Sequence, residues 1–410
     1  MKVAFLIEYF PPYATGGSEW STFYLARQLS KEKTEVVVIT PNYGEKKLQE
    51  KVNFKIIKFP FYKKIKNSHL PGNFFYTNPL WIIWTAINFY LTVKSEKADV
   101  IHVQGKYCLP GARLANLFLR KPIIATLRDY QPICNYGFCL YHKNKGCTPA
   151  EYFGSDFHTY YEEYVQDKNL VNYSLNILFA IWGRLAKNIL AQAARNIKIV
   201  VLSKYQQNVY LANGFKNITV IGNSIVPTKT PKVTKKDQLV YVGRLTPGKG
   251  VNLLISIIPE ICKKYPQYQF LLIGSGFLKG KLKAITLKFN NVKLLDQLDH
   301  EQVLKILEES KLSIIPSVWP EPFGRVVAES LMCNTPVVVT NRGALPELVN
   351  KRWGVVTQAS PHALLMGIKN GLANNHKYET NIYDDRKQLL ETFVTSIPRK
   401  YAKLYEEVTK

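Results

Sequence analysis

Acidic side chains are scarce in this sequence, which holds 30 aspartates and glutamates against 55 lysines and arginines among 410 residues. The formal net charge of +25 implies attraction to an anionic partner such as a nucleotide, a nucleic acid or an acidic membrane surface. The alternative is a solvated basic surface without a specific partner. A charge excess affects association and solubility but does not determine the fold, so it indicates only which classes of partner the protein could bind.

Long apolar runs are also lacking. The longest, residues 79–93, is shorter than the ~20 residues that a membrane-spanning helix needs. We expect a buried helix there, although its Trp81, Trp84, Phe89 and Tyr90 also suit a helix lying in a lipid interface. The N-terminal apolar run is short and follows a single lysine, which argues against a signal peptide. We therefore expect a cytoplasmic protein, and its charge suits peripheral attachment at the inner face of a membrane.

Cysteine is rare, with six residues dispersed along the chain, which fits a reduced protein better than a disulfide framework. Cys134, Cys139 and Cys147 cluster with His142 in a segment that reads as a loop. Zinc binding there is an alternative, but the C-x4-C-x7-C spacing matches no common zinc site. We therefore expect no metal.

Alternating strand and helix patterns dominate the chain. Residues 2–10 form a continuous apolar run, glycines break it, and a helical pattern with Ser18 as N-cap leads to a second apolar strand at 35–40. Such strand–helix–strand units build parallel sheets covered on both faces. Further strands are expected at residues 99–103, 122–127, 197–203, 218–223, 238–245, 269–276, 292–298, 311–317 and 335–341.

The pattern restarts after residue 238, and 410 residues exceed what one hydrophobic core usually covers. The fold class is therefore α/β, with two doubly wound, Rossmann-like parallel-sheet domains that face a cleft. We expect an N-terminal domain at 1–225 with an insertion around 134–195, a proline- and lysine-rich linker at 226–238, and a C-terminal domain at 239–390. Residues 391–410 are expected to form a helix that crosses back to the N-terminal domain.

Glycines follow the first strand of each half. Gly16 and Gly17 let backbone N–H groups approach a phosphate or sugar, and Gly274 follows another strand in "LLIGSG". In "VGRLTPGKG", Arg244 and Lys249 place two cations beside a helix start, an arrangement that suits a diphosphate. Exposed surface cations and ordinary turns are the alternatives. The spacing does not match a Walker motif.

The stretch "PSVWPEPFGRVVAES" carries two carboxylates, Glu321 and Glu329. Prolines on both sides keep Glu321 out of regular helix, so we expect it in the loop, whereas Glu329 projects from the helix that follows. Carboxylates accept hydrogen bonds from paired sugar hydroxyls, and a helix start favours an anion. Capping or surface roles are the alternative.

These segments together resemble a known family along nearly the whole chain. "PPYATGGSE", "YVGRLTPGKGVNLLI", "LLIGSG" and "PSVWPEPFGRVVAESLMCNTPVVVTNRGALPELV" are similar to the signatures of retaining GT-B glycosyltransferases of family 4. The E-x7-E motif from Glu321 to Glu329 is the most specific of them.

The resemblance implies a donor site for a UDP-, GDP- or ADP-sugar, without a cofactor or metal. Arg244 and Lys249 would hold the diphosphate and stabilise its developing charge, while Glu329 takes ribose hydroxyls and Glu321 takes donor-sugar hydroxyls. The backbone around Phe323, Gly324 and Arg325 would approach sugar and phosphate. Gly16 and Gly17 would approach the phosphate or the acceptor, and Gly274 the base or ribose.

Two positions depart from the family pattern. Arg128 in "TLRDYQPIC" stands where a histidine commonly touches the donor sugar, and a permanent cation suits an acidic sugar or an acceptor phosphate. Gln104 stands where a second histidine is frequent, after His102. We place Arg128 and His102 among the candidate catalytic residues, with a packed strand histidine as the alternative for His102.

The expected function is hexose transfer from a nucleotide-diphosphate sugar to a cell-surface glycan, a polysaccharide or a lipid-linked acceptor. A sugar-nucleotide epimerase or a soluble storage-sugar synthase is the first alternative. A basic nucleic-acid-binding protein or a non-catalytic sugar-binding protein is the second. We expect no nucleic-acid partner, because no recognition helix, zinc finger or RNA-binding aromatic signature is present.

Overall fold

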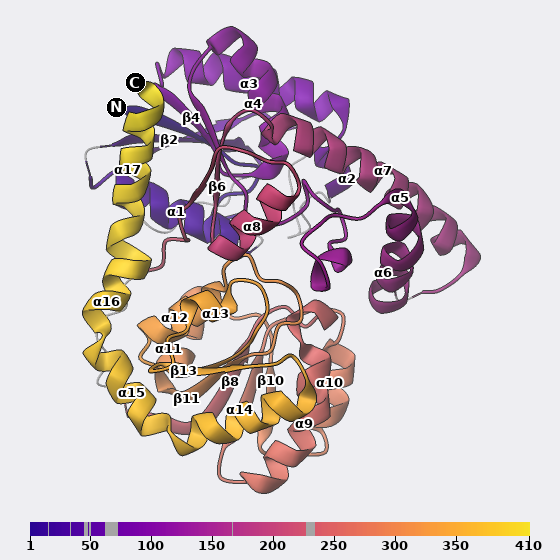
Figure 1. The fold of residues 1–410 in the computed structure, drawn as a ribbon. Coiled ribbons are helices and arrows are strands. Elements are labelled where there is room, and N and C mark those ends of the chain that lie inside the picture. Colours follow the sequence, from indigo (N-terminus) through magenta and orange to yellow (C-terminus); the bar gives the residue numbers. More distant parts are fainter. Residues whose placement is uncertain are drawn as a thin grey trace. The chain divides into compact units, whose positions relative to one another are not determined.

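The structure is a computed structural model that describes residues 1–14, 16–32, 34–44, 48, 51–61, 73–165, 167–226 and 234–410. The chain forms two compact units, and the C-terminal residues belong to the first of them (Figure 1). The N-terminal unit comprises Met1–Ser224 and Thr395–Lys410, and the C-terminal unit comprises Ile225–Val394.

The N-terminal unit is built on a seven-stranded sheet in the order β3-β2-β1-β4-β5-β6-β7. All neighbouring strands are parallel. The central strands are fully buried, as expected for a parallel sheet covered by helices on both faces. The strands are β1 (Lys2–Leu6), β2 (Glu35–Pro41), β3 (Lys55–Phe59), β4 (Val100–Val103), β5 (Ile123–Thr126), β6 (Lys198–Val201) and β7 (Ile218–Val220).

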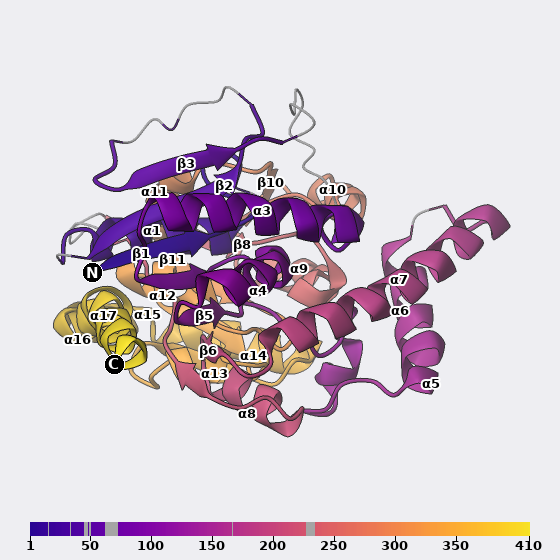
Figure 2. The same ribbon diagram turned by 90° about the horizontal axis from the view of Figure 1, so that it is seen from above.

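Helices of very different length surround this sheet. The final helix of the chain packs against the first, and α4 packs against both α3 and α7 (Figure 2). Side-chain caps begin several of them, and the Asn169 side chain accepts the Asn172 N–H at the start of α7. The helices are α1 (Gly17–Leu29), α2 (Asn73–Tyr76), α3 (Pro79–Ser95), α4 (Leu109–Leu119), α5 (Pro149–Glu151), α6 (Phe157–Tyr164), α7 (Leu170–Ala194), α8 (Lys204–Ala212) and α17 (Ser396–Thr409).

The C-terminal unit holds a six-stranded parallel sheet in the order β10-β9-β8-β11-β12-β13. Successive residues of a strand face opposite sides, so Leu239 and Tyr241 enter one core while Val240 enters the other. The strands are β8 (Lys236–Val242), β9 (Gln269–Ile273), β10 (Val292–Leu295), β11 (Ser310–Ile315), β12 (Val337–Thr340) and β13 (Gly354–Thr357).

The two cores of this unit belong to different helices. Residues of α9, α10 and α14 pack on one face of the sheet, and residues of α11 and α12 on the other. The helices are α9 (Val251–Lys264), α10 (Lys279–Thr286), α11 (His300–Glu309), α12 (Arg325–Met332), α13 (Leu345–Leu348), α14 (Pro361–Ala373), α15 (Asn375–Asp384) and α16 (Arg386–Leu390).

The predicted fold class, two doubly wound parallel-sheet domains, is confirmed. The edge strands β3 and β13 were not predicted, and in β3 two lysines interrupt the apolar pattern. Strand β8 begins at Lys236, inside the expected linker, and residues 227–233 of that linker lie outside the described residues.

Two local predictions are wrong. Helix α1 has Gly16, and not Ser18, as its N-cap. Helix α3 is not buried all round: Trp81 and Phe89 are in the core, but Leu80 and Trp84 are exposed. The helix is amphipathic in its packing although its sequence is apolar throughout.

Candidate active site

The strand order of each unit reverses direction at one place. In the C-terminal unit this switch point lies between β8 and β11, and in the N-terminal unit between β1 and β4. Ligands of doubly wound sheets bind beside the carboxyl ends of the strands at such a point. The loops that follow these four strands are therefore the candidate site.

In the C-terminal unit the two switch-point loops touch backbone to backbone. The N–H groups of Val318 and Trp319 donate to the Gly248 carbonyl at 3.1 and 2.9 Å. Gly250 has a φ of +74°, and a Cβ there would lie 1.8 Å from the Pro316 carbonyl oxygen. Only glycine fits this approach, so the loop after β8 and the loop after β11 form one continuous wall.

Lys249 and Glu321 meet on this wall. Lys249 Nζ lies 2.6 Å from Glu321 Oε1, which also accepts the Ser317 hydroxyl at 2.6 Å. The Glu321 side chain is only 9% exposed and that of Lys249 is 27% exposed. Oε2 of Glu321 accepts no hydrogen bond from the described residues. The pair thus presents an ammonium group and an available carboxylate oxygen at one point.

The main chain of Glu321 is held from behind. Its carbonyl accepts the Ala344 N–H at 2.8 Å, and a Cβ at Gly343 would lie 2.3 Å from its nitrogen and its oxygen. Gly343 has a φ of +59°, which also favours glycine. The loop after β12 therefore fixes the direction in which Glu321 points.

Glu329 lies on α12 and is buried. Its Oε1 accepts Arg325 Nε at 2.6 Å and contacts His300 Nε2 of α11 at 2.8 Å. Burial alone would raise the pKa of this carboxyl, but Arg325 and His300 outweigh it and lower the pKa. Glu329 is therefore held as a carboxylate, and Arg325 and His300 are held with it.

The remaining predicted residues of this unit lie at the same strand ends. Arg244 is exposed after β8, and its guanidinium forms no ion pair within the described chain. Gly274 has a φ of +141°, and a Cβ there would lie 2.0 Å from the Gly243 carbonyl oxygen. Phe323 is buried against Phe393, and Gly324 is the left-handed N-cap of α12. The structure thus brings Arg244, Lys249 and Glu321 to one switch point and backs them with glycine contacts.

The N-terminal unit presents Gly16 and Gly17 at the start of α1. The Gly16 N–H donates to Glu19 Oε2 at 2.8 Å, and its φ of −172° is open to any residue. The nearest atom to a Cβ at Gly16 would be 3.7 Å away. Neither backbone strain nor crowding within the chain requires glycine at this position.

His102 is fully buried in β4. Its Nδ1 is 2.7 Å from the Tyr405 hydroxyl, and its Nε2 is 2.8 Å from the Thr126 hydroxyl. Burial, with a smaller contribution from Arg128, holds the pKa of His102 well below its ordinary value. The imidazole is neutral and both its nitrogens are occupied, so the geometry favours the packed strand histidine over a catalytic group.

Arg128 follows β5 and is tied to the residue at the second departure from the family pattern. It donates to the Gln104 carbonyl at 2.9 Å and to the Gln104 side chain at 2.6 Å. Next to it, Asp129 forms an ion pair with Lys106. Burial opposes the charge of Lys106, but Asp129 outweighs it and the pKa of Lys106 is raised. These residues form a charged cluster at the carboxyl ends of β4 and β5.

Glu8, two residues beyond β1, joins this edge and was not predicted. It is 6% exposed, its Oε2 has no hydrogen-bond partner among the described residues, and Gly105 leaves it room. Burial raises the pKa of Glu8 to about 7, against an opposing contribution from Lys106. Its signal in the sequence was an acidic residue at the end of an apolar strand.

His300, Ser317, Lys106 and Asp129 were also missed. His300 is 29 residues from its partner Glu329 in the sequence. Ser317 is close to Glu321 but belongs to no motif of its own. Lys106 and Asp129 could have been found, because each comes just after a predicted strand.

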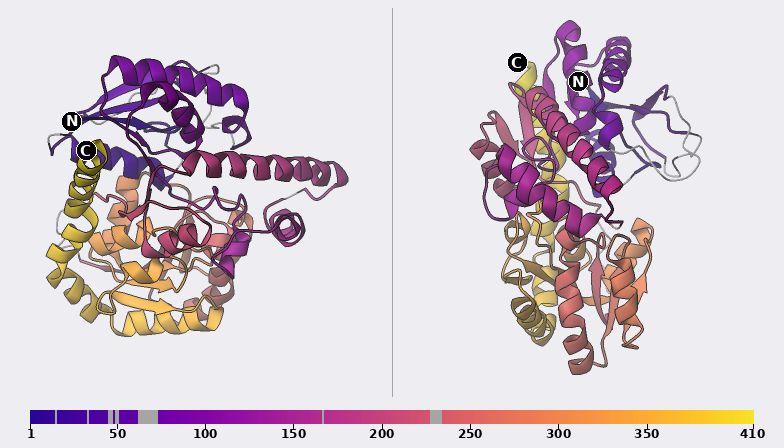
Figure 3. Two further views of the ribbon diagram at one scale, coloured as in Figure 1. Left: turned by 45° about the horizontal axis from the view of Figure 1, so that its top comes forward. Right: turned by 90° about the vertical axis from the view of Figure 1, so that its right-hand side faces the viewer.

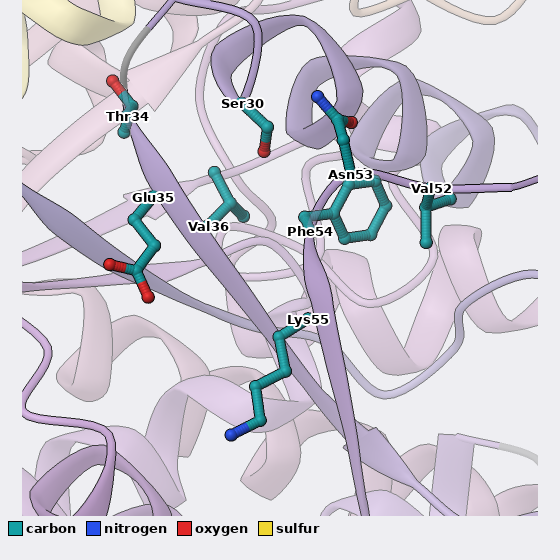
Figure 4. A pocket seen from close by; sticks show the side chains of 8 residues that line it. All are labelled: Ser30, Thr34, Glu35, Val36, Val52, Asn53, Phe54 and Lys55. Atoms are coloured by element: carbon teal, nitrogen blue, oxygen red, sulfur yellow. The ribbon is translucent and has the colours of Figure 1, made fainter.

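A separate surface pocket lies away from these strand ends. It is formed where β2 and β3 begin, and Figure 4 shows Glu35 and Lys55 projecting from those two strands. Both belong to an ion-pair network with Lys2 and Glu96. Because this is the amino edge of the sheet, it does not match the place where doubly wound sheets bind ligands.

Two Rossmann-like units, each with a parallel sheet and charged loops at its switch point, are the architecture of the GT-B fold. Sequence comparison agrees: residues 15–229 match the family described as "Glycosyltransferase Family 4" and residues 224–388 match "Glycosyl transferases group 1". The chain belongs to this family and is a glycosyltransferase.

Individual relatives are distant. In human phosphatidylinositol N-acetylglucosaminyltransferase, one component is 27% identical over 201 residues, which are 47% of this chain and 41% of the human protein. The GPI3 component of the Saccharomyces cerevisiae enzyme is 24% identical over 393 residues, 91% of this chain and 75% of the yeast protein. The match thus spans less than half of the human relative.

Solved structures support the fold. The Anabaena protein HepE, in a crystal structure with UDP-glucose, aligns with a TM-score of 0.68 at 17% identity, covering 99% of this chain and 100% of that one. At this identity the likeness establishes the architecture alone.

We predict that Gly250→Ala destabilises the C-terminal unit by at least ~2 kcal/mol, because the new methyl would strain a left-handed residue and meet the Pro316 carbonyl. Thermal unfolding should show a lowered Tm. Gly280→Ala is the matched control, since a Cβ there meets no atom within 4 Å and alanine is favoured in helix α10. Equal Tm values for the two variants would contradict the assigned loop contact.

We predict that Glu8→Gln removes a pH dependence of stability. The folded pKa of Glu8 is about 7 against an ordinary 4.5, so the folded state binds the proton more tightly. Its contribution is complete below pH 4.5 and is lost as pH rises through 7, up to ~3 kcal/mol. Wild type loses this contribution as pH rises, so the variant should gain stability relative to wild type between about pH 4 and about pH 8, a range that brackets both pKa values.

Denaturant unfolding at several pH values measures this difference. Glu301→Gln, which removes an exposed carboxylate from the C-terminal unit, is measured beside it as the control for the loss of one negative charge. Parallel profiles for Glu8→Gln and wild type would show that Glu8 titrates as an ordinary glutamate.

Proposed function

We propose that this glycosyltransferase moves a hexose from a nucleoside-diphosphate sugar to a glycan, a polysaccharide or a lipid-linked acceptor, with retention of the anomeric configuration. The observation that carries the proposal is the ion pair between Lys249 and Glu321 at the switch point of the C-terminal unit, with Arg244 in the same loop after β8. HepE, which shares the fold, was solved with UDP-glucose, and this supports a UDP-sugar as the first donor to test.

The cations have a chemical task in this proposal. When the bond between sugar and diphosphate breaks, negative charge grows on the departing phosphate. Lys249 and Arg244 stabilise that charge, and the start of α9 adds its partial positive charge. Arginine supplies a planar fork and lysine a compact charge, so the two can grip different phosphate oxygens.

The carboxylates have a binding task. The available Oε2 of Glu321 is proposed to accept a hydroxyl of the donor sugar, while Oε1 keeps hold of Lys249. Glu329, with its lowered pKa, is proposed to accept ribose hydroxyls. Because Glu321 bridges sugar and lysine, substrate position and leaving-group stabilisation are coupled through one side chain.

The N-terminal unit is proposed to receive the acceptor. Its charged edge of Glu8, Lys106, Arg128 and Asp129 can orient a polar or phosphorylated group, and Gly16 leaves backbone room for it. Arg128 is held by Gln104, so its charge is fixed in place. This fits an acceptor that carries an anionic group.

A membrane surface is proposed as the place of this acceptor. Exposed large apolar side chains gather on α3, α4 and α7, and residues 170–183 of α7 hold no charged residue. Figure 3 shows α7 extending away from the sheet of its unit. Across the residues that the structure describes, no helix combines the length and apolarity needed to cross a bilayer. The proposed mode is shallow insertion of apolar side chains, assisted by the net positive charge.

We predict that one class of nucleotide sugar raises the Tm in a panel of UDP-, GDP- and ADP-sugars, because a ligand that binds only the folded state stabilises it. Lys249→Ala should abolish most of this shift and lower transfer by ~10²–10³-fold, the usual effect of removing one group that stabilises an oxyanion. Transfer is measured by release of the nucleoside diphosphate and by the anomeric configuration of the product.

Lys264→Ala, which removes an exposed lysine from the far end of α9, is the matched control and should bind and transfer as wild type does. If no sugar nucleotide shifts the Tm, or if Lys249→Ala retains full transfer, the proposed donor site is wrong. Conversion of the donor sugar without an acceptor would indicate an epimerase instead.

We predict that the protein sediments with anionic vesicles at low salt, and that Leu175→Glu with Leu178→Glu weakens this binding ~10-fold or more, because two exposed leucines lose their burial in lipid. Leu287→Glu is the control, since Leu287 is 80% exposed but lies in the C-terminal unit. Equal loss in the control would rule out this surface, and equal binding to neutral and anionic vesicles would rule out the contribution of the net positive charge.

A further inference from the structure

Four potential metal ligands from separate parts of the N-terminal unit converge outside the candidate active site. Cys134 follows the turn after β5, Cys139 lies in a short 3-10 helix (Phe138–Tyr141), Cys147 precedes α5, and Asp156 ends a π-helical turn (Tyr152–Asp156). Their sulfur and carboxylate atoms all lie within 4.8 Å of one another. The fourth member is Asp156, and not His142 as the sequence suggested.

The separations suit a single tetrahedral ion. Cys134 Sγ lies 3.0 Å from Cys147 Sγ and 3.6 Å from Asp156 Oδ2, and Cys147 Sγ lies 2.8 Å from Asp156 Oδ2. Bonds of ~2.3 Å to sulfur and ~2.0–2.2 Å to oxygen place tetrahedral ligand atoms ~3.5–3.8 Å apart. Small side-chain rotations reach that geometry. A disulfide needs a sulfur–sulfur distance of ~2.05 Å, so none of the cysteines is paired here.

The four groups are largely buried, and buried anionic groups favour the binding of a cation. Cys134, Cys139 and Asp156 are 4%, 8% and 4% exposed. Within the described chain Asp156 accepts hydrogen bonds but forms no ion pair with a lysine, arginine or histidine, and a buried carboxylate without a cation is costly. A divalent cation among the four groups supplies the missing charge.

Backbone donors already orient two of the groups. The Gly137 N–H donates to Cys134 Sγ at 3.3 Å, and the Cys139 N–H donates to Asp156 Oδ2 at 3.4 Å. Outer hydrogen bonds of this kind hold metal ligands in position. Gly137 has a φ of +78°, which turns the chain tightly enough for Cys134 and Cys139 to share one ion.

We propose that Cys134, Cys139, Cys147 and Asp156 bind one structural Zn²⁺ ion. Three thiolates and a carboxylate favour zinc over magnesium or calcium, and four protein ligands leave no open position for substrate. The cysteines bind the ion as thiolates, so any thiol protons leave to the solvent as the ion enters, and no oxidant is needed. This site is independent of the proposed donor site and of its reaction.

The ion would connect the segment that precedes α7 to the loop that follows β5 of the N-terminal sheet. Cys134 lies six residues beyond Arg128, whereas Asp156 belongs to the segment whose Tyr152 hydroxyl donates to the Ala180 carbonyl of α7 at 2.9 Å. A bond through the metal therefore connects the charged edge of β5 with the segment that contacts the middle of α7. Zinc would hold the exposed apolar helix in a defined direction.

The test is the metal content of the purified chain, measured by inductively coupled plasma mass spectrometry. We expect ~1 zinc per chain in wild type, the stoichiometry of a closed four-ligand site. Cys139→Ser and Asp156→Ala should lower the zinc content several-fold, and Cys262→Ser, a buried cysteine of the C-terminal unit, should leave it unchanged. Chelator treatment should lower the Tm of wild type and of Cys262→Ser.

If the variants fail to fold, measurements on the wild-type protein alone still test the proposed zinc site. Chelated protein refilled with Co²⁺ alone should show an intense sulfur-to-cobalt absorption band and titrate at one ion per chain. The proposal would be overturned if wild type contained no zinc, or if Cys139→Ser kept the wild-type zinc content. It would also be overturned if unfolding without reductant exposed four reactive thiols instead of six, because this would reveal a disulfide.

Discussion

The close approach of two loops at the switch point of the C-terminal sheet is the constraint on which the candidate donor site depends. Gly250 can face the Pro316 carbonyl only because it has no side chain, and the Gly248 carbonyl then collects two N–H groups from the facing loop. Lys249 stands between these glycines, so its direction is set by backbone contacts. Glu321 is fixed in the same way by Gly343 and Ala344. The ion pair between Lys249 and Glu321 is thus a product of main-chain packing.

The same sheet topology carries different chemistry in the N-terminal unit. There the position inside β4 holds His102, which is buried, neutral and fully hydrogen-bonded, while the loops beyond the strands hold charged groups. Strand residues build the core, and residues just past the strand ends remain available to a ligand. Arg128 illustrates the difference: it belongs to the loop, and Gln104 orients it.

The sequence revealed what is encoded locally. Apolar strands, the glycine loops after β8 and β9, and the E-x7-E segment each lie within a short stretch, so the fold class and most candidate donor residues could be predicted. His300 beside Glu329 and Asp156 beside Cys147 join residues from separate elements, and no local pattern reports such a meeting.

Hydrophobic periodicity also failed to predict which face of α3 is buried. Helix α3 carries large apolar side chains on both its buried and its exposed side, so Trp81 is buried and Trp84 is exposed although the sequence does not distinguish them. The role proposed for its outer face could not be separated from a core role by the sequence alone. The short edge strand β3 was missed for the opposite reason, since its lysines obscure the apolar pair between them.

The last helix of the chain has a consequence for biosynthesis. Tyr401 and Tyr405 of α17 reach the Thr126 and His102 side chains inside the first unit, so the second unit is an insertion within the first. During synthesis on the ribosome, the C-terminal sheet can form before Tyr401 and Tyr405 are available to complete the N-terminal core. The core that is begun first is therefore completed only after the whole C-terminal unit has been synthesised.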